Sequence, residues 1–409
     1  MPEQILAALD VGTWSVKAVV AEISDGDPSV INVLGLGEAR TEGARLGRVV
    51  NVPQVAEAVD KAVSEAELMS GIEVRRTHVS LSGGFLRSIN RTGMAPVKRH
   101  EVTSREVDEV RRTATAMQMA ADERPLAVVS QGFAVDDTPG VLDPLGMAAK
   151  CLYGRYHVVT FSEQAARNVR RCCERLELAV DGVHVEPLVS SEAVLDDDER
   201  ELGVLVLDIG AGTTSVAAFR DGMLLHTGVI PIGGAHLTTD LAHGLKTPQG
   251  EAERLLETVG CVDETQIGPD ETFDIPGLGG RAPRTLPRDA IVEVLQPRAE
   301  EILFAAARDL EAADVLPEDL AGGLVLTGGV ASLQGLTELA AEVLGLPARL
   351  GKPRGFGGLN KVLERPDFAA AAGVLRRAAR GEGHIELSKK TGLFRRFTSR
   401  VREMTVDYI

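Results

Sequence analysis

The chain has 409 residues, of which 44% are hydrophobic and 25% charged, and its formal net charge is −16. This length predicts two or more domains, and the composition is that of a globular protein, which excludes a largely disordered or membrane-spanning chain. The negative charge excludes a general nucleic-acid surface, because phosphate backbones bind clustered Lys and Arg.

The cysteines and the N-terminal residues indicate the cellular compartment of the protein. The four cysteines, at positions 151, 172, 173 and 261, lack metal-ligand spacing and suit a reducing cytosol. The opening MPEQILAALDVG does not resemble a signal peptide, and no segment approaches the ~20 apolar residues of a spanning helix. We expect the chain to stay on the cytoplasmic side.

An internal repeat opens each half of the chain. Residues 5–22, ILAALDVGTWSVKAVVAE, and residues 203–220, GVLVLDIGAGTTSVAAFR, each contain an apolar run, an Asp-x-Gly turn and a second apolar run. Each pattern predicts a β-hairpin. The repeat indicates an α/β protein with two duplicated lobes, one related sheet in each.

The first half also predicts an inserted unit. Apolar spacing predicts a helix over 54–70, and alternation predicts a strand over 78–83. A helix over 103–119, a strand over 126–135 and a Pro/Gly-rich loop over 136–146 follow, with Thr103 or Ser104 as the helix N-cap. We interpret residues 80–160 as an inserted α+β subdomain.

The second half returns to an α/β pattern. We expect a helix over 247–259, capped by Thr247 with Pro248 at its first position, and then a turn-rich segment over 263–288. Further helices are expected over 289–312, 333–344 and 367–380, with a strand over 323–327. The predicted units are lobe 1 at 1–79 and 161–198, the insertion at 80–160, lobe 2 at 199–380 with a smaller subdomain at about 240–295, a linker at 381–392 and a tail at 393–409.

Each hairpin carries an acid at the end of its first strand. Asp10 and Asp208 precede a glycine turn, which presents a carboxylate at a cleft beside free backbone N–H groups. We expect the two acids to hold the water shell of Mg²⁺, which dehydrates reluctantly. The phosphate-binding amides would come from Gly12, Thr13, Trp14, Ser15, Gly210, Ala211, Gly212, Thr213 and Thr214.

A third motif, LVLTGGVASLQG at 324–335, predicts a strand, a Gly-Gly turn and a helix start. Gly328 and Gly329 lack side chains, so a base and ribose can lie against the backbone. Each motif alone is more often a tight turn than a site; their order and spacing together predict an ATP site between the lobes.

The three motifs resemble the superfamily of actin, Hsp70 and the sugar kinases. Residues 184–195, HVEPLVSSEAVL, are similar to its first connecting segment, and the resemblance implies that Glu186 positions the attacking water or a Mg²⁺-bound water, with Asp208 as the second catalytic acid. The alternative is an exposed glutamate before a helix-starting proline.

Finer detail resembles one family, the bacterial division protein FtsA. The matching segments run through the whole chain and include RSINRTGMAPVKRHEVTSREVDEVRRTATAM, LGVLVLDIGAGTTSVAAFRDG, HTGVIPIGGAHLTTDLAHGLKTPQGEAERLL and LGKPRGFGGL. The resemblance implies an actin-like ATPase fold, ATP binding with at most slow hydrolysis, self-assembly into filaments, binding of the FtsZ C-terminal peptide, and recruitment of later division proteins.

The chain departs from the family pattern at several positions. Ala211 and Ser215 replace a glycine and an acid in the second hairpin. Ser15 replaces a frequent lysine, whose role would pass to Lys17. Gly250 replaces a common glutamate, leaving Glu253 and Arg254 as the expected contacts beside adenine. Trp14 either covers the cleft mouth or fills an apolar gap.

The tail has the pattern of an amphipathic helix. In LFRRFTSRVREMTVDYI, residues 393–409, Phe394, Phe397, Val401, Met404 and Tyr408 form one apolar stripe, bordered by Arg395, Arg396 and Arg400. This pattern predicts a helix that lies on anionic lipid. The resemblance to FtsA implies that this lipid is the cytoplasmic face of the inner membrane at the division septum. A docked C-terminal helix and a partner-binding helix are the alternatives.

Three functions therefore enter the comparison with the structure. The first is a filament-forming ATP-binding protein that tethers FtsZ to the membrane. The second is a small-molecule kinase of the same superfamily, for which the sequence offers no substrate base or specificity pocket. The third is a pilus-assembly relative of FtsA, which would not use its tail as a lipid helix.

Overall fold

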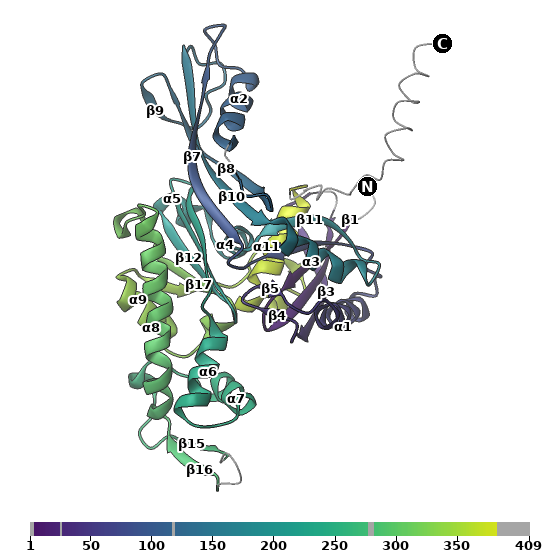
Figure 1. Ribbon diagram of the computed structural model, residues 1–409, viewed down its shortest axis with the longest axis vertical. Coiled ribbons are helices and arrows are strands. Elements are labelled where there is room, and N and C mark those ends of the chain that lie inside the picture. The colour runs from purple at the N-terminus through teal and green to yellow at the C-terminus, as the bar shows by residue number, and fades with distance from the viewer. Residues whose placement is uncertain (1–3, 25–26, 117–118, 277–281, 383–409) are drawn as a thin grey trace.

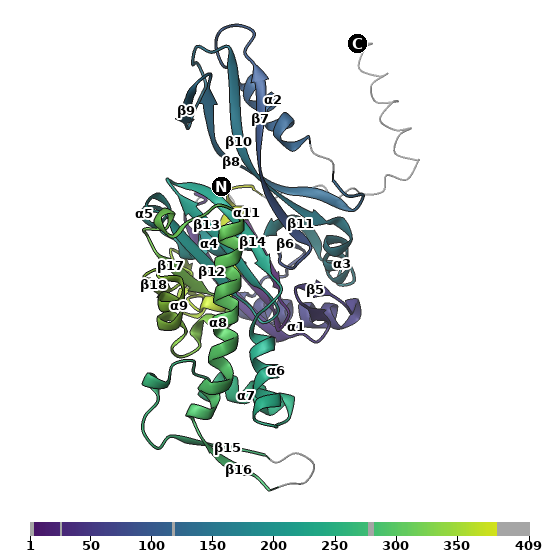
Figure 2. The same cartoon turned by 60° about the vertical axis from the view of Figure 1, so that its left-hand side comes forward.

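The computed structural model describes residues 4–24, 27–116, 119–276 and 282–382 (Figure 1). Two lobes are each built on a mixed sheet, and a third unit projects from one end of the molecule (Figure 2). The strands of the first sheet, in spatial order, are β11 (Ala179–Val185), β6 (Arg76–Leu81), β1 (Gln4–Val11), β2 (Ser15–Ile23), β3 (Ile31–Arg40) and β19 (Gly357–Gly358).

The second lobe repeats the first. Its sheet runs β14 (Met223–Ile230), β13 (Thr214–Arg220), β12 (Val204–Ile209), β17 (Leu324–Thr327) and β18 (Ala348–Leu350). In each lobe the first strand pairs antiparallel with the next and parallel with a later one, β6 or β17. The hairpins are in equivalent register, with Asp10 opposite Lys17 and Asp208 opposite Ser215. The predicted pair of hairpins is confirmed.

Helices cover the first sheet on both faces. α1 (Val52–Ser70) packs on β2 and β3, as its predicted apolar spacing requires, and Asn51 caps it by accepting the Gln54 N–H. α11 (Ala369–Ala379) packs on β1, β6 and α4 (Glu186–Val194). Smaller elements complete the lobe: α3 (Glu163–Glu174), α10 (Asn360–Leu363), β4 (Ala44–Arg45) and β5 (Arg48–Val49).

The inserted unit has a sheet and a core of its own. The sheet runs β7 (Leu86–Pro96), β10 (Cys151–Ser162), β8 (Glu123–Val135) and β9 (Thr138–Val141), and α2 (Ser104–Thr115) packs on β7 and β10. Thr103 caps α2 together with Glu106, as predicted. Two expectations were wrong: α2 ends at Thr115 rather than 119, and the predicted loop 136–146 contains β9. Residues 117–118 lie outside the described residues.

In the second lobe α5 (Asp197–Leu202) precedes the sheet, and α6 (Gly234–Gly244), α7 (Gln249–Val259), α8 (Asp289–Ala312) and α9 (Leu336–Leu344) follow it. α8 has its predicted bounds. The predicted Thr247 cap was wrong: Pro248 takes the N-cap position, and within the described residues the buried Thr247 hydroxyl finds no hydrogen-bond partner. The segment expected to be only turns, 263–288, contains the hairpin β15 (Thr272–Ile275) and β16 (Arg284–Pro287).

Three buried apolar clusters hold the units together. The largest joins the first sheet to α1, α4 and α11 and extends to Val206 and Phe219 of the second sheet. A second joins the second sheet to α6, α8 and α9, and a third lies between α2 and the inserted sheet. Of the helices that the structure describes, none is both long and apolar enough to span a bilayer. The two hairpin turns emerge where the large clusters end, at the junction of the lobes.

Candidate functional site

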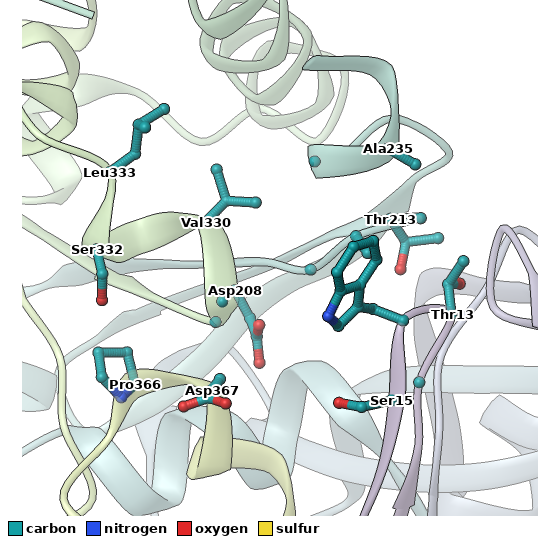
Figure 3. Close-up of a pocket in the computed structure, with 18 of the residues that line it drawn as sticks. Thr13, Ser15, Asp208, Thr213, Ala235, Val330, Ser332, Leu333, Pro366 and Asp367 are labelled. Carbon is teal, nitrogen blue, oxygen red and sulfur yellow. The ribbon is translucent and has the colours of Figure 1, made fainter. Parts of the chain in front are cut away.

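A cavity of about 690 Å³ lies between the lobes where the two hairpin turns face each other (Figure 3). In Figure 3, Thr13 and Ser15 of one lobe lie opposite Thr213 and Asp208 of the other. Most of the predicted site residues line this single cavity: Asp10, Gly12, Thr13, Trp14, Ser15, Lys17, Glu186, Asp208, Gly210, Ala211, Gly212, Thr213, Glu253, Gly328 and Gly329.

Two aspartates reach the cavity from equivalent strand ends, and Asp208 is buried whereas Asp10 is half-buried. Ser80 Oγ donates to Asp10 Oδ1 at 2.6 Å, and Ser190 Oγ donates to Asp208 Oδ2 at 2.5 Å. Burial raises the pKa of Asp10, and burial also raises the pKa of Asp208 from 3.8 to about 6. Both carboxyls are therefore held beside the cavity in an environment that disfavours their charge.

A third carboxyl, half-buried, comes from the start of α4. Glu186 is the first residue of this helix and directly follows β11. Burial, and then repulsion from Asp208 and Asp10, raises the pKa of Glu186 well above its ordinary value, while a hydrogen bond with the Ser215 hydroxyl opposes the shift. Three acids thus converge on one cavity, which is an arrangement that a cation would stabilise.

Lys17 is the buried cation of this cluster. Its Nζ donates to Ser15 Oγ at 2.9 Å and lies 3.5 Å from both Glu38 Oε1 and Asp367 Oδ2. Arg365 binds the same two acids from the outside. Lys17 therefore stays within the first lobe, where one face of the cavity gains positive charge beside the hairpin turn.

The two hairpin turns are built alike. The Gly12 N–H donates to Ser15 O at 3.1 Å, and the Gly210 N–H donates to Thr213 O at 2.9 Å. Ala211 has a negative φ, so its methyl group adds no backbone strain. Gly212 is needed for a different reason: a Cβ there would lie 2.3 Å from Thr13 Oγ1 of the opposite turn. The turns are in direct contact.

Two predicted residues are not among those lining the cavity. Thr214 is buried, and its hydroxyl donates to Ile232 O at 2.8 Å within the second lobe. Arg254 binds Glu251 on the outer face of α7. It lies about 100° round the helix from Glu253, which does line the cavity. These positions do not support the predicted contacts of Thr214 and Arg254 with ATP.

Other lining residues escaped the sequence interpretation. Ser82 follows β6 and its hydroxyl lies 3.2 Å from Thr213 Oγ1; its place after a strand parallel to β1 could have revealed it. Arg288 precedes α8 and is held by Val259 O at 3.0 Å and Gln334 Oε1 at 2.5 Å. Glu38, Arg365 and Asp367 also line the cavity, and no motif in the sequence marked them.

The cavity fits a polyphosphate with a hydrated divalent cation. The cost of bringing three carboxyls together falls when a cation binds beside them, and two glycine turns expose backbone around the same space. Within the described residues no three His, Cys, Asp or Glu side chains form a direct metal cage. A bound Mg²⁺ would therefore take most of its ligands from phosphate and water, which Asp10 and Asp208 would orient.

Gly328 offers a test of the Gly-Gly turn. Its φ is +87°, and a Cβ there would lie 2.4 Å from Asp208 Oδ1, so Gly328→Ala displaces that carboxylate. We expect nucleotide affinity to fall by about tenfold or more, measured by calorimetry, because an acid of the site moves. Gly345→Ala is the control: φ is +64° there, but nothing lies within 4 Å of a Cβ. Equal affinity in both variants would contradict this role.

Two duplicated lobes around a shared cavity define a protein of the actin-like class, as the sequence predicted. Solved structures agree on the fold. The chain is similar to a PilM–PilN type IV pilus biogenesis complex (TM-score 0.67, 19% identity, 91% of this chain and 98% of that one). It is also similar to MreB5 of Spiroplasma citri bound to ADP (TM-score 0.54, 13% identity, 92% and 98%).

Sequence comparisons identify the family. Residues 205–373 match the model of the cell division protein FtsA, and residues 83–160 match that of the SHS2 domain inserted in FtsA. The chain is 36% identical to FtsA of Neisseria meningitidis serogroup B (94% of this chain, 92% of the relative) and 34% identical to FtsA of Escherichia coli K12 (95% and 94%). It belongs to the FtsA family of cell division proteins.

Proposed function

We propose that this chain binds ATP with Mg²⁺ between its lobes, assembles into filaments, and tethers FtsZ to the cytoplasmic face of the inner membrane at the division septum. The observation that carries the proposal is the convergence of three carboxyls where two glycine turns meet: Asp208, which is buried, and Asp10 and Glu186, which are half-buried. Carboxyls this close together destabilise the protein while the cavity is empty, because they repel one another. A ligand that brings a cation reduces this repulsion, so the cluster favours such a ligand.

Each residue of the cavity has a distinct role in this proposal. The amides of the hairpin turns bind phosphate oxygens, and Lys17 adds positive charge from the first lobe. Asp10 and Asp208 orient water around the cation, which neutralises phosphate charge when bound. Glu186 accepts a proton from the attacking water. Slow hydrolysis and a mainly structural role for ATP are part of this proposal.

Several solved structures of the same fold support nucleotide binding and self-assembly. MreB5 of Spiroplasma citri was solved with ADP and with AMPPNP, and MamK as a double helical filament (TM-score 0.51, 12% identity). These structures share only the fold with this chain. Family membership favours the cell-division role over a small-molecule kinase or a pilus-assembly protein.

Membrane attachment is assigned to the tail, residues 393–409, which lie outside the described residues. The described chain ends at Glu382, three residues beyond α11. Phe394, Phe397, Val401 and Met404 would enter the headgroup region, with the neighbouring arginines on anionic phosphates. The inserted subdomain is a candidate platform for later division proteins, because it projects from the lobes (Figure 2).

Co-sedimentation tests the proposal as a whole. FtsZ mixed with anionic vesicles should pellet with them only when this chain is present, and more strongly with ATP and Mg²⁺ than without nucleotide, because tails gathered on a filament bind cooperatively. The amounts of both proteins in pellet and supernatant are measured. FtsZ that pellets equally without the chain, or a chain that stays in the supernatant with ATP, would contradict it.

A further inference from the structure

Three side chains meet at the rim of the cavity. The Arg40 guanidinium lies over the Trp14 ring, and its Nη2 is 3.1 Å from each carboxylate oxygen of Glu253. Trp14 and Glu253 both line the cavity. Arg40 and Trp14 belong to the first lobe, whereas Glu253 lies on α7 of the second. The cluster therefore connects the two lobes across the rim.

The first lobe holds its half of this cluster rigidly. Arg40 ends β3 and is in register with Ser15, the residue after Trp14, across the β2–β3 pair. The next residue, Thr41, donates its N–H to Trp14 O at 3.0 Å. Backbone hydrogen bonds thus hold the backbone of Trp14 beside the end of β3, from which the Arg40 side chain extends.

The second lobe supplies a single side chain from a helix. Glu253 lies in the second turn of α7, and its side chain is 27% exposed against 44% for that of Arg40. Other contacts between the lobes lie beside the cavity and include Ser82 with Thr213, at 3.2 Å, and the packing of Gly212 on Thr13. These lie at the hairpin turns themselves. The Arg40–Glu253 pair is a separate, solvent-exposed connection.

We propose that Trp14, Arg40 and Glu253 form a latch between the lobes that must open before the nucleotide can leave. The inference rests on the proposed nucleotide site and adds a means of controlling release from it. The indole lines the cavity at the first hairpin turn, the guanidinium lies over the indole, and the carboxylate from α7 binds the guanidinium. Lobe opening breaks this ion pair.

The latch is weak enough to open repeatedly. An exposed ion pair and an exposed cation–π contact each contribute modestly, so removing Arg40 should speed nucleotide release about five- to tenfold. High salt should produce part of the same acceleration in the wild type, because it screens the pair. Binding itself should survive, since the acids and turns of the cavity remain intact.

Release kinetics test the latch directly. A fluorescent ADP analogue is bound with Mg²⁺, excess ADP is added, and the decay is followed in the wild type, Arg40→Ala and Glu253→Gln. Matched controls are Arg75→Ala, which removes an exposed arginine paired with Glu73 at 3.0 Å, and Glu251→Gln, on the same helix as Glu253. Faster release in the first two variants alone supports the latch; wild-type rates in both overturn it.

Charge reversal shows whether the two residues act through each other. Arg40→Glu and Glu253→Arg should each accelerate release, and the double variant should restore most of the wild-type rate. Additive acceleration in the double variant would overturn the pairing.

Trp14, the sole tryptophan of the chain, gives a second readout without nucleotide. Arg40→Ala should increase quenching of Trp14 fluorescence by acrylamide, and unchanged quenching would contradict the stacking. If the wild type binds no ADP analogue at all, the proposed nucleotide site fails, and the latch fails with it. If it binds and only the release rates are unaffected, the latch alone fails.

Discussion

Replacing Asp208 by asparagine should abolish Mg²⁺-dependent ATP binding and at the same time stabilise the nucleotide-free protein. Asp208 is buried with Asp10 and Glu186 nearby, and its pKa is raised from 3.8 to about 6. The unfolded chain ionises this group more easily than the folded one does. The contribution of Asp208 to the free energy of unfolding therefore falls as pH rises from about 4 to about 6, and the destabilisation is complete at pH 7.

The magnitude follows from the pKa shift. A shift from 3.8 to about 6 corresponds to at most about 3 kcal/mol at neutral pH, so Asp208→Asn should increase the free energy of unfolding by up to that amount. The gain should shrink near pH 4, where the wild-type carboxyl is protonated in both states. Denaturant unfolding at pH 7 and pH 4, without nucleotide, measures both values.

ATP binding is measured in the same variant, and a second variant serves as its control. Calorimetry with ATP and Mg²⁺ should show heat for the wild type and none for Asp208→Asn, because the neutral amide cannot attract the hydrated cation. Asp60→Asn, on the exposed face of α1, removes a charge far from the cavity and should leave both affinity and stability near wild type. Unchanged ATP affinity in Asp208→Asn would refute the assignment of the site.

The sequence was sufficient to find the two hairpins because their signal is local. An apolar run that ends in Asp-x-Gly and resumes after the turn has one simple interpretation, and its recurrence predicted both the duplicated lobes and the facing acids. β1 with β2 and β12 with β13 form as expected, with Asp10 and Asp208 in one cavity. The pattern of predicted elements over 80–160 indicated the inserted subdomain, and the SHS2 match at 83–160 confirms it.

Residues that act through tertiary contacts could not be found this way. Glu38 on β3 and Asp367 before α11 meet at Lys17, although they are more than three hundred residues apart in the sequence. Neither belongs to a recurring pattern. Arg254 shows the same limit for a helix: the sequence indicated a helix here, but which side chains face the cavity depends on packing against α6, and Arg254 binds Glu251.

Local capping signals can also be overridden. Thr247 followed by Pro248 is a typical helix start, yet the structure begins α7 at Gln249 with Pro248 as N-cap, and the Thr247 side chain is buried. β9 forms where turn-forming residues had predicted a loop. Asp136 adopts φ +50°, and its carboxylate accepts the Lys150 N–H at 3.0 Å. Because of this turn the chain reverses and pairs with β8 inside a Pro/Gly-rich stretch.

Changing both Phe394 and Phe397 to glutamate should release the protein from anionic vesicles. On the predicted tail helix both rings belong to the apolar stripe, and each contributes roughly 1.5 to 3 kcal/mol when fully buried. Losing two rings weakens the affinity of one tail for vesicles by at least about a hundredfold. The two new charges also repel the anionic surface, so the loss of vesicle binding should be nearly complete.

A matched control variant distinguishes the contribution of the apolar stripe to vesicle binding from the contribution of net charge. Ser399 lies about 180° from the stripe on the same predicted helix, so Ser399→Glu adds a negative charge without removing an apolar contact. Vesicle flotation should show a modest, salt-dependent loss for Ser399→Glu and a much larger loss for Phe397→Glu. Because the tail begins beyond α11, ATP binding should be unchanged in every variant. Equal losses for the two single variants would mean that charge, and not the apolar stripe, holds the protein on lipid.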